Sequence, residues 1–99
     1  MPKVTVTLPH DQPADEVVTK VQPAIEKTIQ DFQGSDVNIE WKDQAAEFNF
    51  KSMTFTIKGR VTVDQQQVQV EVDLPFAAIM FKERTEKAIR KNLTRALEQ

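Results

Sequence analysis

Residues 53–81 read MTFTIKGRVTVDQQQVQVEVDLPFAAIMF, and this stretch decides the fold. Apolar side chains fall on odd positions from Met53 to Val63 and on even positions from Val68 to Leu74. Such alternation is typical of strands with one buried and one solvated face. The stretch therefore predicts two long strands joined by a tight turn, followed by a segment that runs directly into a helix.

The turn between these strands determines how they pair. If both apolar sets face one core, odd positions must lie opposite even ones, so the loop has an even length, either 65–66 or 64–67. The missing side chain of Gly59 leaves room for a bulge or a close helix. Opposite charges then meet across the solvated face, and we interpret those carboxylates as structural partners rather than catalytic acids. The predicted pairs are Val63–Val68, Val61–Val70, Gly59–Val72, Ile57–Leu74, Thr62–Gln69, Arg60–Glu71 and Lys58–Asp73.

The rest of the chain extends this pattern. Pro23 interrupts a run in helical phase without shifting it, so we expect one kinked helix that ends at Gly34. Apolar parity changes after Phe50, which predicts a turn at Lys51–Ser52. The expected elements are strands at 3–8, 36–42 and 45–51, a helix at 13–32 and a second helix from Pro75 onward. The side chains expected to face inward include Val37, Ile39, Trp41, Phe48, Phe50, Met53 and Phe55.

The outward-facing positions of all these strands carry no apolar side chain. One face of the sheet is therefore expected to be solvated, while the other carries both helices. The sequence predicts an α+β fold: a two-layer sandwich with a mainly antiparallel five-stranded sheet and two helices on one face, in the order β-α-β-β-β-β-α. At 99 residues, the chain is expected to form a single domain, 1–99.

Composition excludes several classes of protein. The net charge is −2, which disfavours general nucleic-acid binding, although residues 82–99 carry six Lys/Arg against three Asp/Glu. There is no cysteine, and no apolar run approaches the length of a membrane span. The first residues lead directly into a strand pattern rather than a signal peptide. We therefore expect a cytoplasmic protein without integral membrane insertion.

No catalytic constellation is visible in the sequence. His10 is the only histidine, and without a second His or a Cys we expect a structural role in its turn rather than a metal site. Ser35 and Ser52 lie outside any strand-turn-helix elbow, and the two glycines, Gly34 and Gly59, form no phosphate-binding loop. The sequence predicts that the protein is not an enzyme and has no cofactor and no metal.

Three large apolar residues do not fit the predicted second helix. Phe76, Met80 and Phe81 lie roughly 100° or more from the centre of its apolar stripe, which contains Ala78, Ile79, Ile89 and Leu93. Either this first turn is buried on several sides, or it is an exposed patch beside a basic surface. In the second case it could contact a hydrophobic body, another protein or a second copy of the chain. The candidate contact residues are Phe76, Met80, Phe81, Lys82, Arg84, Lys87, Arg90 and Lys91.

The chain resembles the putative polyhydroxyalkanoic acid system protein family over nearly its whole length. The stretches that carry the resemblance are Val4–His10, Trp41 with Phe48, Gly59, and Val68–Phe76. The resemblance implies a small bacterial cytoplasmic protein linked to polyhydroxyalkanoate storage, with no established enzyme activity. We hypothesise association with storage granules or their proteins. The alternative is a small acyl- or lipid-binding domain with an apolar pocket between sheet and helices.

Overall fold

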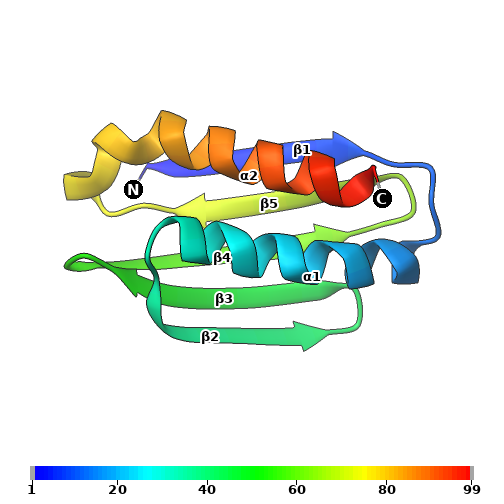
Figure 1. The fold of residues 1–99 in the computed structure, drawn as a ribbon, viewed down its shortest axis with the longest axis horizontal. Helices are drawn as coiled ribbons and strands as arrows, with labels where there is room; N and C mark the ends of the chain where they lie inside the picture. The colour runs from blue at the N-terminus through cyan, green and yellow to red at the C-terminus, as the bar shows by residue number, and fades with distance from the viewer. Residues whose placement is uncertain (1, 99) are drawn as a thin grey trace.

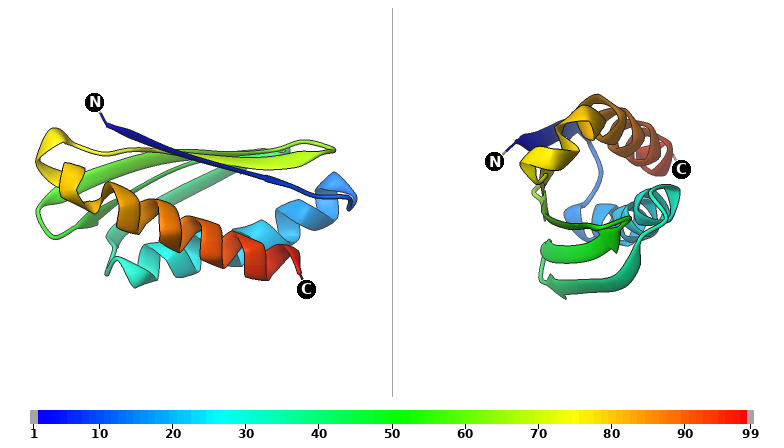
Figure 2. Two further views of the ribbon diagram at one scale, coloured as in Figure 1. Left: turned by 90° about the horizontal axis from the view of Figure 1, so that it is seen from above. Right: turned by 90° about the vertical axis from the view of Figure 1, so that its left-hand side faces the viewer.

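The computed structural model describes residues 2–98 as one five-stranded sheet with both helices on the same face (Figures 1 and 2). The order of elements confirms the predicted two-layer α+β sandwich. The elements are β1 (Lys3–Pro9), α1 (Ala14–Asp31), β2 (Ser35–Lys42), β3 (Ala45–Ser52), β4 (Phe55–Val63), β5 (Gln67–Asp73), a 3-10 helix η1 (Phe76–Phe81) and α2 (Lys82–Leu97).

The strands lie in the order β1-β5-β4-β3-β2, and each pairs antiparallel with its neighbour. Between β4 and β5 the observed pairs run from Val63–Val68 to Lys58–Asp73, in the predicted register. The turn is held by Asp64, whose backbone N–H donates to the Gln67 carbonyl (3.0 Å). Its carboxylate accepts hydrogen bonds from the backbone N–H groups of Gln66 and Gln67, both at 2.7 Å. Parity, together with the polar run 64–67 between the two apolar sets, was therefore sufficient to fix this hairpin.

Gly59 makes room for an aromatic ring rather than for a bulge or a helix. It lies opposite Phe48 on β3 and Val72 on β5. A Cβ added to Gly59 would stand 2.3 Å from Cζ of Phe48 and 2.8 Å from the carbonyl oxygen of Glu71. The Phe48 ring thus covers the glycine from the neighbouring strand, an arrangement that protects backbone which a glycine leaves uncovered.

Helix α1 is continuous across Pro23, which lies on its exposed side, so the predicted single helix is observed. Its end differs in detail from the prediction. Gln33, not Gly34, adopts the left-handed conformation (φ 55°). The N–H groups of Gln33 and Gly34 donate to the carbonyls of Gln30 and Ile29, both at 2.9 Å, which is a Schellman motif. Gly34 is needed because a Cβ there would stand 2.5 Å from the Ile29 side chain.

Two predictions about the strands are wrong. The turn after β3 lies at Met53–Thr54, because β3 continues to Ser52, which pairs with Phe55. Met53 has φ 58° and is 79% exposed instead of facing inward. Val37 is also exposed (44%), because the pairing of edge strand β2 shifts between Ser35 and Asn38. Residues Ile39 and Trp41 of the same strand are half-buried and pack against the core.

The core lies between the sheet and the helices. Its α1 contribution is a stripe of Val17, Val21, Ile25 and Ile29, spaced four residues apart. Helix α2 contributes mainly Ile89, Leu93 and Ala96. The strands supply mostly valines, which suit a pleated surface covered on one face. The buried apolar strand residues are Val4, Val6, Ala46, Phe48, Phe50, Ile57, Val61, Val63, Val68, Val70 and Val72.

Candidate functional site

One end of the molecule carries a set of exposed apolar side chains that we call the apolar end. It combines Met53, at the β3–β4 turn, with Phe76, Ile79 and Met80 of η1. Their exposed fractions are 79%, 70%, 55% and 77% respectively. Figures 1 and 2 show η1 and the β3–β4 turn at the same end of the sheet. Large apolar residues exposed together in this way are typical of interaction sites.

The 3-10 geometry of η1 explains this exposure and corrects the prediction of one α-helix from Pro75. A 3-10 helix has three residues per turn, so residues three apart share a side. Ala78 (1% exposed) and Phe81 face the body of the protein, while Phe76 and Ile79 share an outer side. Ile79 is therefore exposed, whereas α-helical spacing would place it in the buried apolar stripe.

Of the three residues that did not fit the stripe, two are exposed and one is half-buried. Phe81 packs edge-to-face against Phe55 of β4, with 6.5 Å between ring centroids. This contact attaches η1 to the sheet and leaves Phe76 and Met80 free to face outward. Their role as a contact surface stays a prediction.

A groove of about 160 Å³ lies directly beside the apolar end, at the C-terminal end of α1. A separate, smaller cavity of about 30 Å³ lies between helices and sheet and shares Phe32, Ile57 and Thr85 with the walls of the groove. The groove walls are mostly apolar and carry few charges. They comprise Asp31, Phe32, Gln33, Ser52, Met53, Phe55, Ile57, Leu74, Ala78, Phe81, Arg84 and Thr85.

Arg84 supplies a positive charge at this groove. Its guanidinium lies over the Phe32 ring, 5.8 Å from the centroid, a distance suited to a cation–π interaction. Within residues 2–98 it has no carboxylate partner within ion-pair distance. By contrast, Arg90 pairs with Glu86 at 3.6 Å. The predicted basic residues Lys82, Arg84, Lys87, Arg90 and Lys91 are all exposed on α2.

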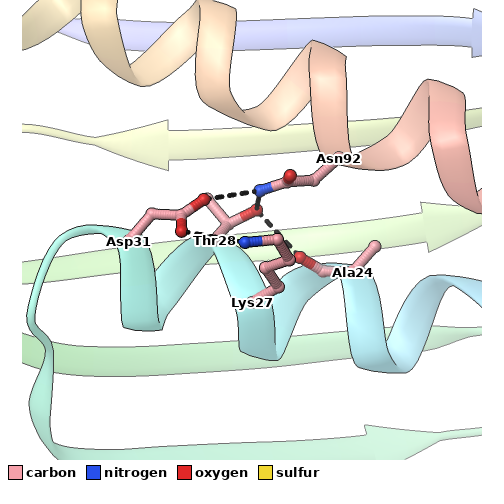
Figure 3. Close-up of polar contacts among 5 residues, drawn as sticks. All are labelled: Ala24, Lys27, Thr28, Asp31 and Asn92. Atoms are coloured by element: carbon pink, nitrogen blue, oxygen red, sulfur yellow. Dashed lines mark hydrogen bonds and ion pairs between the residues drawn. The ribbon is translucent and has the colours of Figure 1, made fainter.

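A polar cluster joins α1 to α2 next to the groove (Figure 3). The buried Asn92 amide donates to Thr28 Oγ1 (2.8 Å) and to the Asp31 carboxylate (3.1 Å). Lys27 also contacts Asp31, at 3.2 Å. The Asn92 hydrogen bond, followed by that from Lys27, lowers the pKa of Asp31 from its ordinary value of 3.8. The Asn92 carbonyl oxygen is buried and accepts no hydrogen bond from the described residues.

His10 lies at the opposite end of the molecule and has a structural geometry. Its Nδ1 accepts the backbone N–H of Gln12 (3.2 Å), so Nε2 carries the proton and donates to the Asp64 carbonyl (2.7 Å). No group of three or more potential metal-binding side chains occurs within residues 2–98. In the same part of the chain, no helix is long and apolar enough to cross a membrane.

Several residues at this site are not predicted by the sequence pattern. The alternation predicts a strand position for Met53, although an even-length turn at 53–54 satisfies the same parity rule as 51–52. The helical stripe predicts a core position for Ile79, which is exposed. Thr28 and Asn92 are not among the predicted site residues, although a polar residue at a core position of each helix indicates an interhelical hydrogen bond.

Fold and groove together define the class: a small α+β protein in which two helices cover one face of an antiparallel sheet, with an apolar groove open at one end. The chain belongs to the family described as putative polyhydroxyalkanoic acid system protein, whose sequence profile matches residues 4–97. No curated protein matches the chain significantly.

Two solved structures align with the chain at low identity. The crystal structure of BexL, a di-domain ARO/CYC from the BE-7585A biosynthetic pathway, aligns with a TM-score of 0.50 and 13% identity. The alignment covers 99% of this chain and 50% of that one, so the chain spans about half the length of BexL. A protein from Thermus thermophilus, TTHA0849, aligns with a TM-score of 0.40 and 8% identity, over 98% of this chain and 94% of that one. The likeness to BexL shows the fold alone.

Proposed function

We propose that this is a non-catalytic protein that binds the surface of polyhydroxyalkanoate storage granules in the cytoplasm. The observation that carries the proposal is the apolar end, where four large apolar side chains are more than half exposed. The chain's membership of the polyhydroxyalkanoic acid system family points to the polyester granule as the hydrophobic surface that this end would contact. A polyester surface offers no defined pocket, so it suits a protruding apolar contact.

The size of the contact is adequate for reversible adsorption. Fully burying a side chain of this kind contributes about 1.5–3 kcal/mol, so partial burial of four such side chains favours a weak, reversible interaction. Lys82 directly follows η1. Its charge favours anionic groups on the bound surface, such as the carboxylate ends of polyester chains.

The test is co-sedimentation of the purified protein with polyhydroxybutyrate particles, with polystyrene beads as a hydrophobic control. Wild type should bind the polyester selectively, and Met80→Glu should reduce binding strongly because it places a charge in the contact. Val37→Glu is the matched control, since it changes an exposed apolar residue on the edge strand β2. Equal binding by Met80→Glu and wild type would exclude the apolar end as the contact.

A second copy of the chain, or a soluble protein partner, is the competing occupant of the apolar end. Sedimentation equilibrium separates a dimer from the granule contact, because it is measured without particles. A dimer that Met80→Glu dissociates, together with no selective polyester binding, would replace the proposed granule contact by self-association.

A further inference from the structure

The groove beside the apolar end has features that adsorption to a granule does not use. Its walls combine an apolar floor with one uncommitted cation and two buried hydroxyls. A flat polyester surface would engage only the protruding side chains of η1 and the β3–β4 turn. Concave sites with a few convergent polar groups are typical of small-molecule binding.

We infer that this groove binds a short hydroxyalkanoate anion, with its alkyl chain on the apolar floor and its carboxylate on Arg84. The inference does not require the granule contact, because it concerns a soluble ligand in a neighbouring concave site. Its ligand is a single hydroxyalkanoate unit, either a free acid or the carboxylate end of a polyester chain.

The apolar walls set the length of the chain. Phe55, Ile57, Leu74 and Phe81 line the groove, whose volume is about 160 Å³. An apolar cavity of about 150 Å³ accommodates benzene, so the groove has room for about six carbon atoms. The smaller cavity of about 30 Å³ adds little further depth. Short alkyl chains are therefore expected to fit, and long fatty acids are not.

The charges at the groove select an anion. Arg84 has no carboxylate partner within residues 2–98, and its planar guanidinium is suited to a bidentate carboxylate contact. Asp31 also lines the groove and would repel an anion. However, its carboxylate is already bound by Lys27 (3.2 Å) and Asn92 (3.1 Å), so much of its charge is compensated.

Two buried hydroxyls in the walls favour a hydroxy acid over a plain alkanoate. Ser52 donates to the Phe32 carbonyl (2.6 Å) and Thr85 to the Phe81 carbonyl (2.8 Å). Each hydroxyl has therefore used its single donor but keeps acceptor capacity. A ligand hydroxyl can donate to either oxygen, whereas an alkanoate cannot.

The test is an NMR titration of the ¹⁵N-labelled protein with 3-hydroxyhexanoate, hexanoate and hexan-1-ol. We expect saturable shifts at the backbone amides of residues 52–57 and 78–85, with the hydroxy acid binding several-fold more tightly than hexanoate and hexanol binding most weakly. Arg84→Gln should weaken 3-hydroxyhexanoate binding about tenfold, since a hydrogen bond to a charged group is lost. Lys87→Gln, on the next turn of α2, should bind like wild type.

Several results would overturn the inference: no saturable shifts, shifts that map away from the groove, equal binding of hexanol, or equal losses in Arg84→Gln and Lys87→Gln. Ala78→Leu fills the groove and should abolish binding if it folds. If Ala78→Leu does not fold, the Arg84→Gln variant still tests the inference, because Arg84 is exposed and its substitution leaves the core intact.

The ligand could be a free hydroxy acid or the carboxylate end of a polyester chain, and comparing 3-hydroxybutyrate with its linear trimer distinguishes the two. Tighter binding of the trimer would identify the polyester end as the ligand, and tighter binding of the monomer would identify the free acid. Particle sedimentation is a separate measurement, so the granule contact and the groove can fail independently.

Discussion

The two ends of the sandwich are closed in opposite ways. The β1–α1 loop and the β4–β5 turn lie at the same end of the sheet (Figure 1). At this polar end, the side chains of His10 and Gln12 join separate elements by hydrogen bonds. His10 donates to the Asp64 carbonyl, and Gln12 donates to the Leu97 carbonyl at the end of α2 (2.8 Å) and accepts from Lys20. At the apolar end, η1 and the β3–β4 turn instead expose apolar side chains beside an open groove. We therefore expect the polar end to contribute mainly to stability, and we propose binding only for the apolar end.

The largest expected effect comes from breaking the polar end. The double variant His10→Ala/Gln12→Ala removes the two hydrogen bonds that join the β1–α1 loop to the β4–β5 turn and to α2. A typical hydrogen bond contributes about 0.5–1.5 kcal/mol, so the free energy of unfolding should fall by about 1–3 kcal/mol. Urea denaturation measures this loss. Particle binding should persist while the variant is folded, and a loss of binding without a loss of stability would contradict the division between the ends.

An intermediate effect on stability is expected near the apolar end, where Asn92 of α2 donates a hydrogen bond to Asp31 of α1. Because folding lowers the pKa of Asp31 below 3.8, its ionised form stabilises the native state. That contribution is complete above the unfolded-state pKa and is lost as the pH falls through the lower folded-state pKa.

Urea denaturation of wild type and Asp31→Asn between about pH 6 and pH 2.5 tests this linkage. The variant should be the less stable protein at the higher pH, and the difference should shrink below about pH 4. Asp11→Asn is the control, since Asp11 is exposed and forms no ion pair within residues 2–98. A difference that does not change with pH would show that Asp31 acts through packing rather than charge.

Where the sequence alternates strictly, the structure could be predicted residue by residue. The β4–β5 register follows from parity, because a slip of one residue would expose every valine of one strand. The solvated face was predictable for the same reason. The polar end was partly predictable: His10 was expected to act in its turn, but its bond to Asp64 joins residues 54 positions apart and leaves no local pattern.

The apolar end could not be predicted from hydrophobic periodicity, because η1, its central segment, shows no alternation of apolar and polar residues. All six residues of η1, FAAIMF, are apolar, so the sequence cannot distinguish α-helical from 3-10 spacing there. That choice decides whether Ile79 is buried or exposed. The β3–β4 turn was ambiguous in the same way, since two even-length loops satisfy one parity rule. The groove depends on both features and therefore appears only in three dimensions.

The smallest effect on stability is expected at the apolar end itself. Phe76→Gln/Met80→Gln alters side chains that are 70% and 77% exposed, so the free energy of unfolding should change by no more than about 0.5 kcal/mol. The same variant should lose polyester binding, because two of the four apolar contacts become polar. Urea denaturation and co-sedimentation on one protein preparation measure both. A loss of about 2 kcal/mol or more would show that η1 is a structural cap packed on the groove. The two ends would then differ in chemistry but not in role.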